Sequence, residues 1–76
     1  MTEVPFPRLS EKPDAEGVLA TWFVADGDPV GEGQLIGEVM VDKVSGEVHA
    51  TASGRIHILV AEEQVVRQGQ AIAQVD

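Results

Sequence analysis

The sequence predicts an all-β domain in which two similar halves pack face to face as two antiparallel sheets. Valine and isoleucine recur in short runs, and eight glycines and four prolines separate these runs. β-Branched side chains pack well on a pleated sheet, whereas glycine and proline favour turns. The chain lacks the apolar spacing of an amphipathic helix. We therefore expect no helix longer than one turn.

The second half of the chain repeats the first after a shift of 36 positions. The matching positions are Val30 with Val66, Gly33-Gln34 with Gly69-Gln70, Ile36 with Ile72, and Val39 with Val75. Each copy predicts a strand, an acidic turn, a short strand, a glycine turn and another strand. An isolated hairpin is marginal in water, so the copies should pack as a small sandwich or flattened barrel with approximate twofold symmetry.

Proline and glycine positions assign the remaining elements. Pro5 and Pro7 fit only an edge strand, because proline lacks the N–H donor that a central strand needs. The polar segment from Leu9 to Glu16 is expected to form a surface loop. Gly33 and Gly69 are predicted turn residues with positive φ; neither is followed by the lysine or helix of a phosphate-binding loop.

A predicted hairpin occupies the middle of the chain. Its strands are Gln34 to Val41 and Val44 to Ala52, and Asp42-Lys43 between them would form the tip, since aspartate favours tight turns. Under the twofold axis this tip and the paired chain termini lie at opposite ends. The alternative is a turn at Ser45-Gly46, which would shift the register and move every following side chain to the other face.

Chain length, cysteine content and net charge restrict the classes of function that the domain can have. A chain of 76 residues is expected to form one domain, residues 1–76, with a small core. The absence of cysteine excludes disulfides and thiolate chemistry. A net charge of -8 would repel nucleic acids and anionic membranes, so a protein partner should offer a basic face. We expect a soluble, untargeted, monomeric domain, located in the cytoplasm or, in a eukaryote, in the mitochondrial matrix.

Other chemically active side chains give weak signals. His49 and His57 lie eight positions apart without cysteine or a clear carboxylate partner, so a metal site is not predicted. Phe6, Trp22 and Phe23 are the aromatic residues, and core packing or a partly exposed face is expected for them. The chain offers no nucleophile and base arrangement and is too small for a deep pocket, which disfavours an enzyme.

The chain resembles the lipoyl domain of the dihydrolipoyl acyltransferases, within the biotinyl/lipoyl carrier family, from about Val4 to Val75. The resemblance rests on Gly17-Val18-Leu19-Ala20-Thr21-Trp22, Gly27-Asp28, Val30, Gly33-Gln34, Glu38-Val39, Asp42-Lys43, Glu47-Val48 and Ser53-Gly54. It implies two four-stranded sheets and a lysine at a hairpin tip that carries lipoic acid in amide linkage. That lysine is Lys43, and Asp42 and Val44 flank it as recognition positions.

The resemblance also implies a role and partners. Lipoate on a swinging arm would carry acyl groups and reducing equivalents between the active sites of a 2-oxo acid dehydrogenase complex. The implied partners are a lipoate ligase, a thiamine-dependent 2-oxo acid decarboxylase, an acyltransferase core and dihydrolipoamide dehydrogenase. The family places a surface loop near the lipoyl lysine that helps partners choose their domain, and Leu9 to Glu16 corresponds to it. The chain would be a carrier, either part of an acyltransferase subunit or free-standing.

Two other functions stay open. A biotin carrier domain shares the fold, but its tip is similar to Ala-Met-Lys-Met, whereas Lys43 has Asp42 and Val44 as neighbours. The second open function is that of an interaction module that kept the barrel and lost the cofactor. The lipoyl family tip often has the sequence Glu-Thr-Asp-Lys-Ala, and Met40 replaces its acidic residue here. That departure leaves open which dehydrogenase would recognise the domain.

Overall fold

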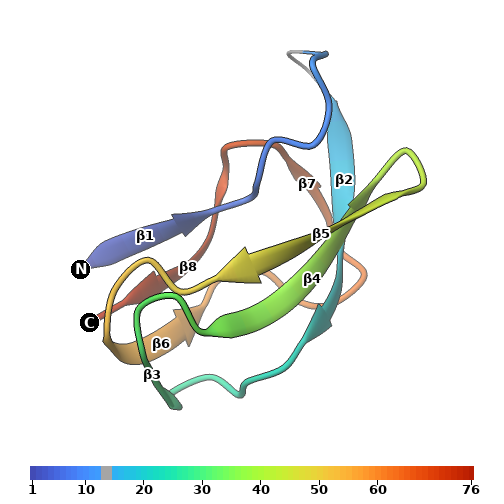
Figure 1. Ribbon diagram of the computed structural model, residues 1–76. Coiled ribbons are helices and arrows are strands. Elements are labelled where there is room, and N and C mark those ends of the chain that lie inside the picture. Colours follow the sequence, from blue (N-terminus) through green and yellow to red (C-terminus); the bar gives the residue numbers. More distant parts are fainter. Residues whose placement is uncertain (13–14) are drawn as a thin grey trace.

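The computed structural model describes residues 1–12 and 15–76, and within them it contains eight strands and no helix (Figure 1). The strands are β1 (Thr2–Pro5), β2 (Glu16–Trp22), β3 (Pro29–Val30), β4 (Leu35–Val41), β5 (Val44–His49), β6 (Gly54–Ile58), β7 (Val65–Arg67) and β8 (Ala71–Val75). They form two four-stranded antiparallel sheets, ordered β1-β8-β6-β3 and β5-β4-β2-β7. The predicted all-β, two-sheet fold is confirmed.

The two sheets are related by the twofold symmetry that the repeat predicted. In the sheet orders β1 corresponds to β5, β8 to β4, β6 to β2 and β3 to β7. The turn glycines correspond as well: Gly33 and Gly69 both have a φ of 85°. The N–H of Gly33 donates to Ala50 O at 2.8 Å, and that of Gly69 donates to Phe6 O at 2.9 Å. The prediction of paired positive-φ turns is therefore confirmed.

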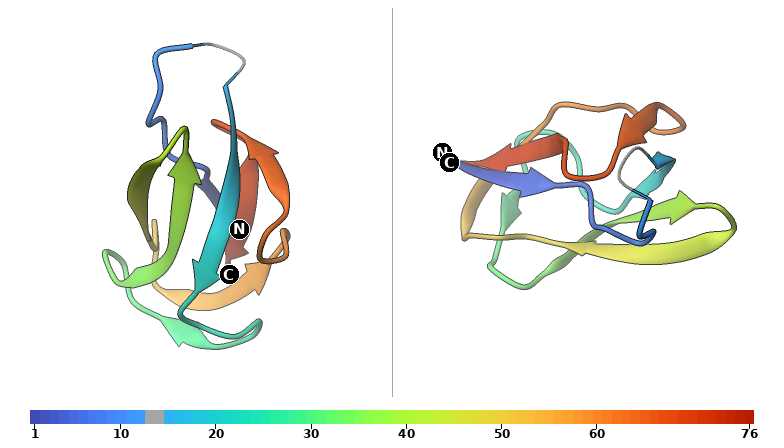
Figure 2. Two further views of the ribbon diagram at one scale, coloured as in Figure 1. Left: turned by 90° about the vertical axis from the view of Figure 1, so that its right-hand side faces the viewer. Right: turned by 90° about the horizontal axis from the view of Figure 1, so that it is seen from above.

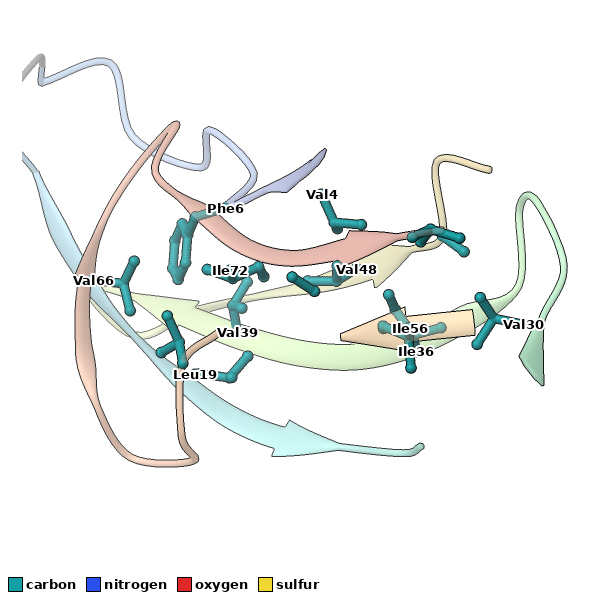
Figure 3. Packing of buried hydrophobic residues seen from close by; sticks show 14 of the residues in the cluster. Val4, Phe6, Leu19, Val30, Ile36, Val39, Val48, Ile56, Val66 and Ile72 are labelled. Atoms are coloured by element: carbon teal, nitrogen blue, oxygen red, sulfur yellow. The ribbon is translucent and has the colours of Figure 1, made fainter. Parts of the chain in front are cut away.

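A single apolar layer fills the space between the sheets (Figure 3). Its largest fully buried side chains are Phe6, Leu19, Ile36, Ile56 and Ile72, with Val4, Val39, Val41, Val66 and Val75. Both halves of the repeat contribute to this layer, so neither half has a complete core without the other. Burial of apolar area at roughly 25 cal/mol per Å² then makes the association of the two sheets the main stabilising term.

The aromatic residues differ in their burial. Phe6 is buried and Trp22 is partly buried, with its indole N–H donating to Val60 O at 2.9 Å. Phe23 is 53% exposed, so of the two expected placements it has the partly exposed one and adds little to the core. It lies beyond the end of β2, where its side chain points outward. Leu59, its equivalent in the repeat, is 51% exposed in the same way.

Strand ends depart slightly from the sequence prediction. β1 is an edge strand that ends at Pro5, as its prolines predicted. β5 ends at His49 rather than Ala52. Ala50 leaves the sheet because its N–H and C=O bond with Gln34 and Gly33, and the chain then bends at Thr51. Across residues 1–12 and 15–76 no helix is long and apolar enough to cross a membrane.

The two ends of the molecule carry different features (Figure 2). The N- and C-termini lie side by side at one end, where β1 pairs with β8. The hairpin of β4 and β5 projects at the opposite end, as the twofold axis predicted. The chain segment that follows β1 runs to the hairpin end before it enters β2.

Candidate functional site

The hairpin tip is a two-residue turn at Asp42 and Lys43. Val41 pairs with Val44 across it, and Asp42 and Lys43 have φ values of 49° and 73°. Positive φ at both central residues defines the type I′ turn, which matches the twist of the strands it joins. The alternative turn at Ser45-Gly46 is wrong, because both residues lie within β5 and pair with β4.

Lys43 is exposed, with an unfavourable backbone conformation for its residue type. Type I′ turns favour asparagine or aspartate followed by glycine. Asp42 fits that preference, whereas a lysine in the left-handed region costs about 1 to 2 kcal/mol relative to ordinary backbone. Strained residues of this kind concentrate at functional sites. The hairpin therefore keeps a lysine where glycine would be less strained.

The surroundings leave the Lys43 amine accessible. Two histidine–carboxylate contacts occur among residues 1–12 and 15–76, His49 with Glu47 at 3.8 Å and His57 with Asp76 at 2.8 Å, and neither includes Lys43. The two histidines lie in different sheets, and the described part of the chain holds no cluster suited to a metal. Val44, beside the lysine, is 50% exposed. This geometry suits covalent attachment at Lys43 Nζ rather than binding in a cavity.

The segment after β1 packs against the hairpin through Leu9. A Cβ on Gly46 would lie 2.7 Å from Leu9 Cδ1, which is closer than real contacts allow. Gly46 therefore has no side chain because Leu9 covers that point of β5, three residues from Lys43. The predicted surface loop reaches the hairpin with this residue, and its members Pro13 and Asp14 lie outside the described residues.

Gln68 holds this segment in place, and sequence reasoning missed it. Its Oε1 accepts the N–H groups of Leu9 and Ser10 at 2.6 and 2.7 Å, and its Nε2 donates to Ser10 O at 3.0 Å and Lys12 O at 3.5 Å. Gln68 precedes the turn glycine of the second half. Its repeat equivalent is Glu32, so a break in the repeat was the available signal.

Comparison with known proteins identifies the family of this fold and hairpin. The biotin/lipoyl family model, described as "Biotin-requiring enzyme", matches residues 2–75. The chain belongs to the biotinyl/lipoyl family. Among solved structures, the lipoyl domain of the 2-oxoglutarate dehydrogenase complex of Azotobacter vinelandii superimposes with a TM-score of 0.74 and 29% identity, covering 96% of this chain and 95% of that one.

Curated relatives place this biotinyl/lipoyl chain among the lipoyl domains of acyltransferases. It is 39% identical, over 97% of its length, to the lipoamide acyltransferase component of the Bacillus subtilis branched-chain alpha-keto acid dehydrogenase complex. It is 42% identical, over 96%, to the succinyltransferase component of the Staphylococcus saprophyticus 2-oxoglutarate dehydrogenase complex. The chain spans only 18% and 17% of these two relatives.

Proposed function

We propose that this lipoyl domain carries its cofactor on Lys43 and acts as the swinging arm of a 2-oxo acid dehydrogenase complex. The observation that carries the assignment is the turn itself. An exposed lysine occupies a left-handed position that favours glycine, at the apex of a hairpin opposite both chain ends. A reactive amine at that position can enter the active site of another enzyme without interference from the rest of the domain.

The residues of the tip have separable roles in this function. Lys43 Nζ would form the amide bond once a ligase has removed its proton and activated the lipoate carboxyl group. Asp42 stabilises the turn, since aspartate tolerates the left-handed region. Val44 offers an exposed apolar contact beside the attachment point. The attached dithiolane would supply the acyl-transfer and redox chemistry, so the domain itself needs no catalytic residue.

The partners follow from this role. A lipoate ligase would modify the lysine, and a thiamine-dependent decarboxylase, an acyltransferase core and dihydrolipoamide dehydrogenase would meet the arm in turn. The names of the relatives support this set, because they are acyltransferase components of 2-oxo acid dehydrogenase complexes. Because the domain has a net charge of -8, the surfaces of these partners that contact it should be basic.

Intact mass after incubation with a lipoate ligase, lipoate and ATP tests the proposal. The unaltered domain should gain one lipoyl group. Lys43→Arg should gain none, because a guanidinium stays protonated and does not attack an activated carboxyl group. Its free energy of unfolding should change by no more than about 0.5 kcal/mol, the usual range for surface substitutions.

Lys12→Arg is the matched control, since Lys12 is the other lysine and is exposed. It should be lipoylated like the unaltered domain. Lipoylation of the Lys43→Arg protein would show that lipoate is attached to a residue other than Lys43. A biotin gain with biotin ligase, without a lipoyl gain, would instead assign a biotin carrier, and no gain with either ligase would indicate an unmodified interaction module.

A further inference from the structure

Three apolar side chains form a row across the outer face of the sheet that carries the hairpin. Met40 of β4 is the register partner of Val18 of β2, and Val18 is also the partner of Val65 of β7. Direct partners in antiparallel strands lie on the same face, with Cβ atoms about 5 Å apart. Met40 is 39% exposed and Val65 is 58% exposed. We call these three residues the apolar row.

The other sheet provides an internal comparison. The repeat places Asp76 at the position of Met40 and Pro29 at that of Val65, each displaced by 36. Arg55 corresponds to Val18, displaced by 37 because β2 contains a bulge after Leu19. The register agrees, since Arg55 pairs with Pro29 and its C=O accepts the Asp76 N–H at 2.9 Å. The sheet fold therefore accepts charged residues at these positions and does not require an apolar row.

One pair of exposed apolar residues follows the symmetry instead. Phe23 and Leu59 are repeat equivalents and are exposed to the same extent, 53% and 51%. The fold itself accounts for such a pair. The apolar row, by contrast, occurs only in the sheet whose hairpin carries Lys43, and Met40 lies three residues from that lysine.

Charge around the row restricts what can cover it. Glu38 and Asp42 lie two positions from Met40 along the chain, and Glu16 lies two positions from Val18. Glu47 is the register partner of Glu38. Arg67 faces Glu16 across the strands and offsets one of these charges. A second copy of the chain would bring like charges together, whereas a surface with an apolar centre and a lysine or arginine rim would be complementary.

We propose that the apolar row is a docking surface for the thiamine-dependent 2-oxo acid decarboxylase that acylates the lipoyl group on Lys43. This inference rests on the proposed function. A protein that encloses the hairpin tip also reaches Met40, because that residue is next to the last strand pair before the turn. The row then supplies apolar contact area and the acidic residues around it steer the basic partner.

Reductive acylation kinetics test the docking surface. The lipoylated domain is offered to purified decarboxylases of pyruvate, 2-oxoglutarate and branched-chain complexes, each with its own 2-oxo acid, and the most active one is used. Met40→Gln should raise KM severalfold, and Met40→Gln with Val18→Thr and Val65→Thr should raise it about tenfold or more, corresponding to a loss of about 1.4 kcal/mol. kcat should change little, because the arm itself is unaltered.

Leu35→Gln is the matched control, because Leu35 lies in the same strand as Met40 and is also 39% exposed, but at the end away from Lys43. It should leave KM unchanged. Lipoylation should proceed equally in all variants. Thermal melting identifies any variant that fails to fold. If the triple variant does not fold, the KM of the single Met40→Gln variant decides whether the decarboxylase uses the row.

Each other outcome overturns the inference in a recognisable way. An unchanged KM in folded row variants, or an equal rise for Leu35→Gln, shows that the decarboxylase does not use the row. A loss confined to the ligase reaction assigns the row to the ligase. A concentration-dependent increase in mass by light scattering that the variants abolish assigns it to self-association. Failure of the unaltered domain to be lipoylated, or to be acylated by any of the three enzymes, refutes the proposed function as well.

Discussion

In a type I′ turn both central residues have positive φ, and glycine at the second of them relieves most of the strain. Lys43 stands at that second position with a φ of 73°. Stability alone would favour glycine there. The presence of lysine at this position supports the attachment role proposed for Lys43, on grounds separate from the comparison with relatives.

Lys43→Gly tests whether the Lys43 side chain is dispensable for the fold. The substitution removes a left-handed penalty of about 1 to 2 kcal/mol, while the added freedom of the unfolded chain costs about 0.4 to 1 kcal/mol. The free energy of unfolding, measured by urea denaturation, should stay equal or rise by up to about 1.6 kcal/mol, and lipoylation should be lost. Destabilisation by more than about 1 kcal/mol would show that the Lys43 side chain contributes to the fold.

At the scale of elements, the segment between β1 and β2 depends on distant parts of the chain for its position. Gln68 bonds to its backbone, and Leu9 packs over Gly46 of β5. Gln68 lies 59 positions after Leu9 in the sequence, and Gly46 lies 37 positions after it. These distant residues therefore position the segment beside the hairpin. Partner enzymes that contact the tip would meet this segment as well.

Gln68→Ala should release the segment. Amide hydrogen exchange at Leu9 and Ser10 should accelerate by about tenfold or more, because a hydrogen bond contributes roughly 0.5 to 1.5 kcal/mol and two N–H groups lose their acceptor. Global stability should fall by about 1 to 2 kcal/mol. Gln74→Ala, next to the last residue of β8, serves as the control and should leave both amides protected. Unchanged exchange in Gln68→Ala would mean that Leu9 packing alone positions the segment.

For the molecule as a whole, the twofold repeat makes a quantitative prediction. Gly33 and Gly69 have the same φ and equivalent hydrogen bonds, so their replacement should have the same effect. Either Gly33→Val or Gly69→Val should destabilise by about 1 to 3 kcal/mol, the cost of a strained backbone region. Chemical denaturation of the two variants should give values within about 1 kcal/mol of each other.

Gly31→Ala is the control for this pair. Gly31 has no left-handed φ, and a Cβ there would meet nothing within 4 Å, so its replacement should change stability by no more than about 0.5 kcal/mol. Strongly unequal effects at Gly33 and Gly69 would show that the symmetric backbone conceals unequal packing. If neither valine variant differed from Gly31→Ala, the positive-φ requirement would be wrong.

Much of the molecule could be predicted from the sequence because its signals are local or periodic. The 36-residue shift predicted two equivalent halves, and glycine placement predicted the paired turns. Asp42-Lys43 between two apolar runs predicted the hairpin tip, since turn chemistry acts within a few residues. Pro5 marked an edge strand for the same reason, because a missing N–H donor is a property of the residue itself.

Tertiary structure decided the features that depend on which distant residues meet. Gly46 weakens a strand by its own properties, and only the position of Leu9 explains it. Phe23 is as apolar as Phe6, but Phe23 follows the end of β2 and is exposed, whereas Phe6 is buried in the core. Met40, Val18 and Val65 are far apart in sequence, and the register of three strands places them in one row. Sequence alone determined the repeat and its turns, because those depend on neighbouring residues, whereas cross-strand register and burial are settled only when the whole chain packs together.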